Sequence, residues 1–537
     1  MKRDNLKGRI TQMTVILLCI ATLQTASANQ LLIAAVKERD TATTRALIKQ
    51  NIDVNSPQAD GATALHWAVH RDDLETARLL IRAGANVNAT NDFGVMPLSL
   101  ACTNGNAAMA ETLLKAGAES NAILMTGETL LMTAAYAGDL DTVDALLRHG
   151  ADANAKEPVR QQTALMWALG EKHPGVAQKL VEHGADINAT TTLGFTPLLF
   201  AAREGDLEST KLLLDNGADP NTRVGVERDT DKTDLMGLQD STKLSALHIA
   251  VQRGHGEVAA LLLERGADPN YADPGWTPLH WATGTWETEM NGANGMTSPK
   301  GHEWDALRGV QQGKYELVKV LLDHDADPNA RLQKTPARFG FTVTRQAKNI
   351  TPLGLAAFAG EGDIMRLLVE YDADMSLTPD NGLSPLLIAA GVNRFRAEQA
   401  VSEEALLTAV EAALELGADV NEKDKDGNTA LHGAARIRAM EITQFLYDQG
   451  ADVNAKNKRG QTAISVAERD NGRKLDHSEL ADLLRELSVP PVVKDSVEEW
   501  ATLPRHIRDA IEALLQGELD EAAAKREERR NRRKRKQ

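Results

Sequence analysis

Cysteine and aromatic residues are scarce in this chain. It has two cysteines in 537 residues, and Phe, Trp and Tyr together make up 4% of the sequence. Cys19 lies in an N-terminal segment that we expect to be removed, which leaves Cys102 alone and excludes an intramolecular disulfide. Because Cys102 lies in an apolar stretch, we expect a small buried side chain and not a reactive thiol. The low aromatic content is typical of small helices that pack through Leu, Ala and Val.

Long apolar runs are also missing. The apolar stretch near the N-terminus, residues 15–21, is shorter than the ~20 residues that a membrane span requires. It follows a basic start (Lys2, Arg3) and precedes the small residues Ala26-Ser27-Ala28, which is the order of a secretory signal peptide. An uncleaved membrane anchor is the alternative. We predict that residues 1–28 are a signal peptide and that the protein is exported to the bacterial periplasm.

The sequence lacks recognisable catalytic and cofactor motifs as well. We find no Gly-rich phosphate loop, no nucleophile elbow and no paired-cysteine zinc pattern. His66 and His70 stand four residues apart and offer one edge of a metal site, but no third ligand follows at a fixed spacing. We therefore predict no catalytic residue, no metal site and no cofactor, and we expect that the protein is not an enzyme.

What the chain has in abundance is a short motif that returns about every 33 residues. Its first example, Thr63-Ala64-Leu65-His66, places a hydroxyl residue where a helix begins, so that the side chain can accept a free backbone N–H group. Proline at the second position, found in several copies, suits the first turn of a helix. Variants begin at Thr129, Thr163, Thr196, Ser245, Thr277, Thr351, Ser384, Thr429 and Thr462, and Met96-Pro97-Leu98 fills an early gap.

A second motif follows the first after roughly twenty residues. In Gly84-Ala85-Asn86-Val87-Asn88, the glycine lies where an amphipathic helix over residues 74–81 is expected to end in a left-handed residue. The two motifs predict a unit of two helices joined by a short turn and followed by an extended loop. One unit cannot bury its own apolar face, so neighbouring units must stack. Further copies begin at Gly150, Gly184, Gly266, Gly417 and Gly450.

Both motifs resemble those of the ankyrin-repeat family, whose unit of about 33 residues carries a T-P-L-H-x-A helix start. The resemblance covers residues 29–488 in about 11 or 12 units, and it implies an all-α solenoid of helix-turn-helix units with extended finger loops. His66, His248, His280 and His432 share one motif position, and the resemblance implies that they are structural and bond the backbone of neighbouring loops. The family binds partners of almost any kind. The resemblance therefore implies a non-catalytic scaffold that binds proteins through its finger loops and concave face.

The period breaks at four insertions, which lie near residues 222–244, 284–312, 330–350 and 391–402. Extra residues in a repeat protein form loops on one face, so we expect partner contacts there. The second and third insertions are rich in Trp, Phe and Met, the residue types that anchor interfaces. The candidate partner-binding residues are Trp286, Met290, Met296, Trp304, Phe339 and Phe341. Two alternatives stay open: these rings pack the insertions onto the scaffold, or residues 283–350 hold an active site that the repeats support.

Two units depart from the motif. Asp325 and Asp372 replace the terminating glycine, and Met375-Ser376 replaces the usual pair of an apolar residue and asparagine. We expect local distortion of these units and a break in folding cooperativity between residues 325 and 376.

The C-terminal region differs from the repeats. Residues 489–524 are expected to form a linker and an amphipathic helix, with apolar residues at helical spacing from Trp500 to Leu514. Residues 525–537 are strongly basic and form either a solvated disordered tail or a tether to anionic lipid or an acidic partner surface. The net charge of the whole chain is nevertheless −16 at pH 7, which argues against nucleic acid as a partner of the repeat array.

Overall fold

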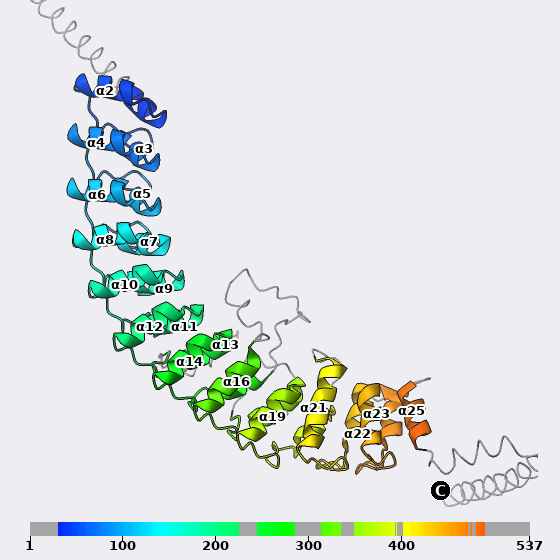
Figure 1. The fold of residues 1–537 in the computed structure, drawn as a ribbon. Helices are drawn as coiled ribbons and strands as arrows, with labels where there is room; N and C mark the ends of the chain where they lie inside the picture. The colour runs from blue at the N-terminus through cyan, green and yellow to red at the C-terminus, as the bar shows by residue number, and fades with distance from the viewer. Residues whose placement is uncertain are drawn as a thin grey trace, which may run out of the picture. The chain divides into compact units, whose positions relative to one another are not determined.

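The computed structural model consists of successive pairs of short helices (Figure 1). Twelve such pairs lie within the described residues, which confirms the predicted all-α repeat fold and the number of units. The described residues are 30–224, 244–284, 313–333, 348–392, 394, 401–470, 473–474 and 479–488. They belong to two compact parts of the chain. The N-terminal part is Met1–Ala356 with Arg366–Asp380, and the C-terminal part is Ala357–Met365 with Asn381–Gln537.

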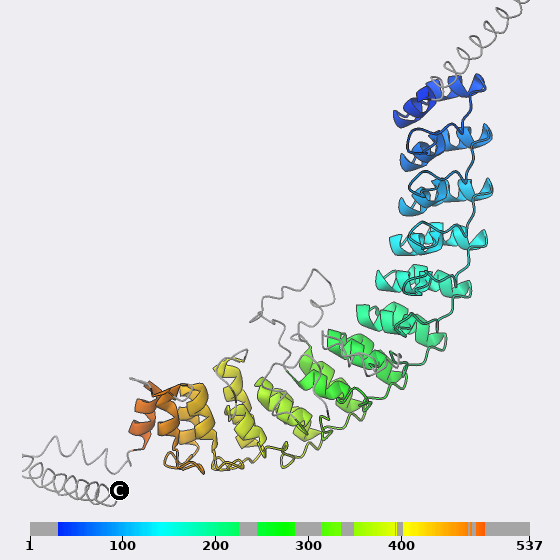
Figure 2. The ribbon, with the colours of Figure 1, turned by 180° about the vertical axis from the view of Figure 1, so that it is seen from behind.

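In the N-terminal part the helices form two rows (Figures 1 and 2). The first helix of each pair packs against the first helices of its neighbours, and the second helices do the same among themselves. The first helices are a helix over residues 30–37, α3 (Ala64–His70), α5 (Pro97–Thr103), α7 (Leu130–Ala137), α9 (Ala164–Gly170), α11 (Pro197–Glu204), α13 (Ala246–Arg253) and α15 (Pro278–Thr283). The second helices are α2 (Thr41–Lys49), α4 (Leu74–Arg82), α6 (Ala107–Lys115), α8 (Leu140–Arg148), α10 (Pro174–Glu182), α12 (Leu207–Asp215), α14 (Gly256–Glu264) and α16 (Lys314–Asp323).

The next pair, α18 (Pro352–Ala359) and α19 (Gly362–Glu370), contributes residues to both the N-terminal and the C-terminal part. The C-terminal part continues with the same pairing, in which α20 packs on α21, α22 on α23 and α24 on α25. Its helices are α20 (Pro385–Ala389), α21 (Glu403–Glu415), α22 (Ala430–Ile437), α23 (Met440–Asp448), α24 (Ala463–Ala467) and α25 (Glu479–Leu487). A two-residue antiparallel ribbon, β1 (Arg469–Asp470) with β2 (Arg473–Lys474), lies between α24 and α25.

The motif residues do at the helix starts what their chemistry predicts. The hydroxyls of Thr129 and Ser245 accept the backbone N–H groups of the residues three positions later, each at 3.3 Å. At Thr63 the reverse contact is also present, because Nδ1 of His66 accepts the Thr63 N–H group at 3.1 Å. These contacts satisfy backbone donors that a helix N-terminus leaves free.

The motif histidines also join neighbouring units, as expected. The Nε2 atoms lie 3.0 Å from the Val95 carbonyl oxygen for His66, and 2.9 Å from that of Gln461 for His432. His248 makes the same contact with the Trp276 carbonyl, at 3.2 Å. His280 differs, since its Nε2 has no hydrogen-bond partner among the described residues.

Asparagines of the second motif form a further set of links between units. Asn154 is typical: its Nδ2 donates to the Gly184 carbonyl at 3.0 Å, and its Oδ1 accepts the Asp186 N–H group at 2.7 Å. Each such amide therefore ties the turn after one second helix to the equivalent turn of the next unit. The same pair of bonds is made by Asn55, Asn88, Asn121, Asn221, Asn270, Asn329 and Asn421.

The two aspartates that replace glycine keep the geometry of the other turns. Asp325 and Asp372 have φ of 64° and 66°, in the left-handed region that glycine usually occupies there. Their carbonyl oxygens accept the side-chain N–H groups of Asn270 and Asn329 at 2.8 and 2.9 Å. The predicted local distortion at these two positions is therefore wrong. Loss of folding cooperativity nearby stays a prediction. Ser376, which stands where other repeats have the linking asparagine, lies close to the boundary between the N-terminal and C-terminal parts.

Cys102 lies in α5 and is fully buried, as predicted. Burial raises the pKa of its thiol to about 12, so the side chain stays protonated and unreactive at neutral pH. In the described ranges, no helix combines the length and the apolar character that a membrane crossing needs.

Candidate partner-binding face

The loop that joins each second helix to the next first helix forms a finger, which we name by the helix that follows it. Successive fingers touch at their tips. A Cβ atom added to Gly94 of the α5 finger would lie 2.3 Å from Cγ of Met125 in the α7 finger. Likewise, one added to Gly127 would lie 2.7 Å from Cγ of Pro158 in the α9 finger. Glycine at these positions therefore allows both the left-handed turn and the close stacking of the next finger.

Four consecutive fingers expose large apolar side chains at these tips. Such residues normally face the core, and a contiguous exposed set indicates an interaction site. Exposed fractions range from 47% for Leu193 to 77% for Met125. We call this set the tip row, and it consists of Phe93, Ile123, Met125, Val159 and Leu193.

Polar side chains at the base of each tip fix its conformation. In the α5 finger, Oδ1 of Asn91 accepts the N–H groups of Phe93 at 3.0 Å and Val95 at 2.8 Å. In the α9 finger the buried carboxylate of Glu157 accepts three backbone N–H groups at 2.7 to 2.9 Å, including that of Val159. The exposed apolar residues therefore stand on ordered turns, which lowers the conformational entropy lost on binding.

Aromatic side chains of the first helices adjoin the fingers. Trp67, Trp167 and Phe200 occupy the same place in their helices, four residues after the motif hydroxyl, and Tyr136 packs edge-on against Trp167 at 5.9 Å. We call Trp67, Tyr136, Trp167 and Phe200 the ring row, in which Phe200 is buried, Trp67 and Trp167 are partly buried and Tyr136 is exposed.

Two contacts connect the ring row to the fingers. The ring of Phe200 lies 6.1 Å from that of Phe195 in the α11 finger. The ammonium of Lys37 lies 4.1 Å from the centre of the Trp67 ring and donates to Oε1 of Gln58 in the α3 finger at 2.9 Å. The ring row and the fingers thus border one surface.

Charge changes sign along the fingers. Asp60, Asp92 and Glu128 place a carboxylate on each of the α3, α5 and α7 fingers. A backbone hydrogen bond from Ala62 is the largest of the effects that hold the pKa of Asp60 below its usual value, so this carboxylate is ionised at neutral pH. The α9 finger carries the exposed cations Lys156 and Arg160 beside the buried carboxylate of Glu157. The exposed charge therefore changes from acidic on the α5 and α7 fingers to basic on the α9 finger.

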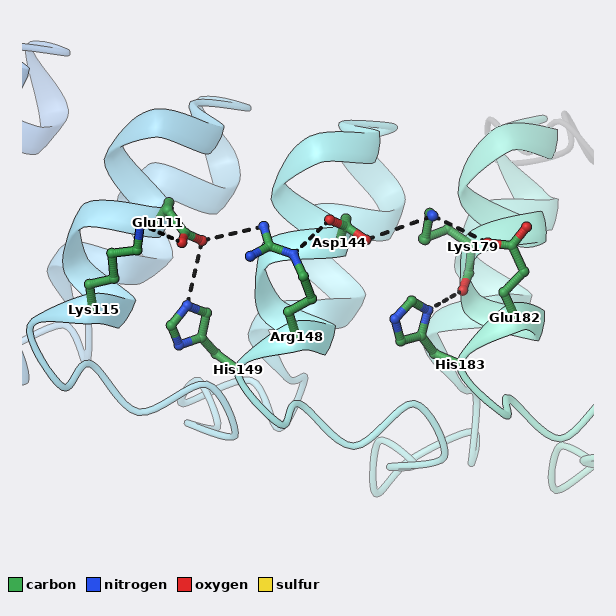
Figure 3. Close-up of polar contacts among 8 residues, drawn as sticks. All are labelled: Glu111, Lys115, Asp144, Arg148, His149, Lys179, Glu182 and His183. Atoms are coloured by element: carbon green, nitrogen blue, oxygen red, sulfur yellow. Dashed lines mark hydrogen bonds and ion pairs between the residues drawn. The ribbon is translucent and has the colours of Figure 1, made fainter.

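The face formed by the second helices has a different character, because its charges pair with one another (Figure 3). Arg148 of α8 binds Asp144 on its own helix at 2.8 Å and Glu111 of α6 at 3.5 Å. Lys179 of α10 lies 3.7 Å from Asp144 and 3.2 Å from Glu182. Exposed pairs of this kind contribute little to stability, because water and salt screen them. On α6, α8 and α10 this face therefore carries charges that largely neutralise one another.

The residues predicted from the insertions, Trp286, Met290, Met296, Trp304, Phe339 and Phe341, lie outside the described residues. The structure does show where the insertions leave the array. The Val224 N–H group bonds the Leu244 carbonyl, and the Leu332 N–H group bonds the Ile350 carbonyl, both at 3.0 Å. At the insertion near residues 284–312, Nζ of Lys314 donates to the Gly284 carbonyl at 3.0 Å. Residues 1–28, which we predict to be a signal peptide, and residues 489–537 also lie outside the described residues.

Sequence reasoning missed the tip row and the ring row because it searched where the period breaks. The signal was in the regular units. When the units are aligned on the motif hydroxyl, Phe93 and Leu193 stand three residues before it, and Met125 and Val159 stand four before it. These are loop positions, where large apolar residues are not needed for the fold.

The repeated helix pairs, the motif contacts and the asparagine links define a class of protein, the helical repeat scaffolds. A family model described as three copies of the ankyrin repeat matches most of the chain, and a model of a single ankyrin repeat matches residues 275–332. The chain therefore belongs to the ankyrin-repeat family, whose members are generally protein-binding scaffolds without enzymatic activity. No curated protein matches it. The three-repeat model covers residues 11–91, 31–124, 71–157, 131–224, 229–289 and 397–495.

Proposed function

We propose that this protein is an exported scaffold of the bacterial periplasm that binds a partner protein through a concave face made of the tip row and the ring row. One observation carries the proposal: four consecutive fingers expose large apolar side chains on ordered turns, while charged side chains on the second helices α6, α8 and α10 pair with one another. A partner that covered the tip row would remove several large apolar side chains from water at once.

The sequence supports the export part of the proposal. Residues 1–28 have the basic, apolar and small-residue order of a signal peptide, and the remaining chain holds a single buried cysteine. With one cysteine the chain can form no intramolecular disulfide, so its fold does not depend on an oxidising or a reducing compartment.

Affinity in this proposal comes from a few anchors. Binding energy in protein interfaces concentrates in a small number of large side chains that fill pockets of the partner. Met125 and Val159 are the most exposed members of the tip row, so we assign them the central role.

Site-specific photo-crosslinking in cells that produce the full-length chain tests the proposal. The crosslinking residue is placed at Met125 or Val159, and at Leu140 or Leu207 as matched controls. The controls are also exposed apolar residues, but they begin the second helices α8 and α12. We expect protein adducts in the periplasmic fraction from the tip positions and few from the controls. Equal adducts at both sets, or a chain found only in the cytoplasm, would contradict the proposal.

Two further contact regions belong to the proposal. The aromatic and methionine residues of the insertions, Trp286, Met290, Trp304, Phe339 and Phe341, extend the partner contact beyond the tip row. The basic segment 525–537 adds a weak attraction to anionic lipid or an acidic surface. Deleting residues 334–347 should weaken partner capture, and deleting residues 525–537 should weaken binding to vesicles that contain anionic lipid.

A further inference from the structure

We propose that the tip row binds an extended segment in the polyproline II conformation, with an apolar side chain at every third residue and opposite charges at its two ends. This inference rests on the proposed function, because it names the kind of segment that a partner protein would present to this face. Three features of the tip row support it: its spacing, its hydrogen-bonding groups and its distribution of charge.

The spacing of the fingers matches the polyproline II period. Packed helices lie about 8–10 Å apart, so the three steps between the α5 and α11 fingers span about 24–30 Å. A polyproline II segment advances about 9.3 Å per turn of three residues, or about 28 Å over three turns. One apolar side chain per turn therefore meets one finger per unit, from Phe93 to Leu193.

Other regular conformations fit this spacing less well. Side chains on one face of a β-strand recur every ~6.7 or ~13 Å, which falls between the fingers. An α-helix repeats its face every seven residues, at about 10.5 Å, and reaches about 32 Å over three steps. The mismatch grows at each finger for a helix and is immediate for a strand.

Hydrogen-bonding groups on the face also favour an extended segment. Backbone groups at the finger tips bond between fingers, as in the Asp92 N–H bond to the Asp60 carbonyl at 3.0 Å and the Thr192 N–H bond to the Arg160 carbonyl at 2.9 Å. These groups are not free to add a strand.

The ring row offers donors instead. The indole N–H groups of Trp67 and Trp167 have no acceptor among the described residues. Both nitrogens are covered, so each partly buried ring must turn to donate, and a free backbone carbonyl of a partner is a suitable acceptor. A polyproline II backbone leaves all its carbonyls free, whereas those of a helix are bonded internally.

Charge complementarity sets the ends of the segment. Asp92 and Glu128 lie at one end of the tip row, and Arg160 lies towards the other. No ion pair joins any of the three to another described residue. Charges farther apart than the Debye length of about 8 Å act separately at physiological salt. The segment therefore carries basic residues beside Phe93 and acidic residues beside Leu193.

The test measures binding of synthetic peptides to the full-length protein by fluorescence anisotropy. The first peptide has four Leu-Pro-Pro units with two lysines at one end and two glutamates at the other, and it is made in both orders. Controls are the same residues with the leucines in one block, a helical peptide with leucine at every seventh residue and the same ends, and Leu-Pro-Pro peptides with only lysines or only glutamates.

The better of the two bipolar peptides should bind about tenfold more tightly than every control, a difference of about 1.4 kcal/mol. Its advantage over the uniformly charged peptides should shrink as salt is added. Equal binding of the blocked or the helical peptide would overturn the extended segment, and equal binding of a uniformly charged peptide would overturn the charged ends.

Variants of the protein locate the effect. The pair Met125→Ser and Val159→Ser should weaken binding of the bipolar peptide about tenfold, whereas Leu140→Ser with Leu207→Ser should leave it unchanged. Asp92→Lys with Glu128→Lys should make the all-glutamate peptide the preferred one. Far-UV circular dichroism confirms that each variant is folded.

The two proposals fail in different ways. If crosslinking in cells depends on the tip row but the three-residue period gives no advantage, the partner-binding face stands and the polyproline II segment falls. If the period gives its advantage but no crosslinks form at the tips in cells, the segment specificity stands and the periplasmic scaffold falls.

Discussion

Acid should destabilise the middle of the array through two buried histidines, His248 and His280. Both rings are almost fully buried, and burial lowers the pKa of each to about 4 from an unfolded value of 6.5. The neutral ring is built into the fold at His280, because its Nδ1 accepts the Thr277 N–H group at 3.2 Å. Protonation would turn this acceptor into a donor and place an unsolvated charge inside the stack.

The sign and the size follow from these pKa values. Because the folded-state pKa lies below the unfolded one, the stabilisation is fully present above pH 6.5 and is lost as the pH falls through 6.5 towards 4. At pH 5, each ring lowers the free energy of unfolding by about 2 kcal/mol relative to pH 7.5, so the two together remove about 4 kcal/mol.

The assay compares the wild type with the double variant His248→Met and His280→Met. Methionine is a natural choice, since the chain itself places Met132 and Met166 at the same motif position in α7 and α9. Urea unfolding at pH 7.5 and pH 5 is followed by tryptophan fluorescence, to which the buried Trp276 contributes beside His248.

The pH-dependent loss of stability should be smaller in the double variant by about 4 kcal/mol. His70→Gln, which changes an exposed ring on α3, should lose as much stability as the wild type. The reasoning is refuted if the wild type and the double variant lose the same stability between the two pH values.

Three further predictions concern links within and between units. Asn421→Ala removes two bonds to the next unit and should cost about 1 kcal/mol of unfolding free energy, whereas Asn454→Ala, whose side chain bonds no other described residue, should cost little; equal urea midpoints would count against this. Glu157→Gln should speed hydrogen exchange of the three amides that its carboxylate holds, and unchanged rates would argue that the turn is self-supporting. Gly138→Ala should destabilise by at least about 1 kcal/mol, because φ is 77° and the added Cβ would meet His173 at 2.5 Å; Gly170→Ala in α9 meets nothing and should stabilise slightly, and thermal melting decides between them.

Much of the fold could be predicted because local chemistry repeats. A hydroxyl at Thr129 finds its helix N–H group three residues later in any such helix, and the left-handed turn at Gly84 needs no distant partner. The role of His66 and the burial of Cys102 follow in the same way from their places in the unit.

The tip row was not predicted, because the search for a site began with the insertions and the tip row lies in units of regular length. The insertion residues stay a prediction, since they lie outside the described residues. Burial of a loop residue depends on its place in the finger as well as on its neighbours: Trp276, directly before Thr277, is 3% exposed, and Phe93, three residues before Met96, is 69% exposed. Trp276 packs against His248 and Trp281, which lie in two different units.

The sequence by itself determined the unit, its period and the contacts that the motif residues make, because these depend on residues at fixed separations. Only the tertiary structure decided which side chains outside the motifs meet between units. Arg148 and Glu111 are 37 residues apart and pair because α6 and α8 stack with that register. Met125 stays in water because the stacked fingers leave its side chain on their outer surface, and packing of this kind depends on three-dimensional distances that a linear motif does not contain.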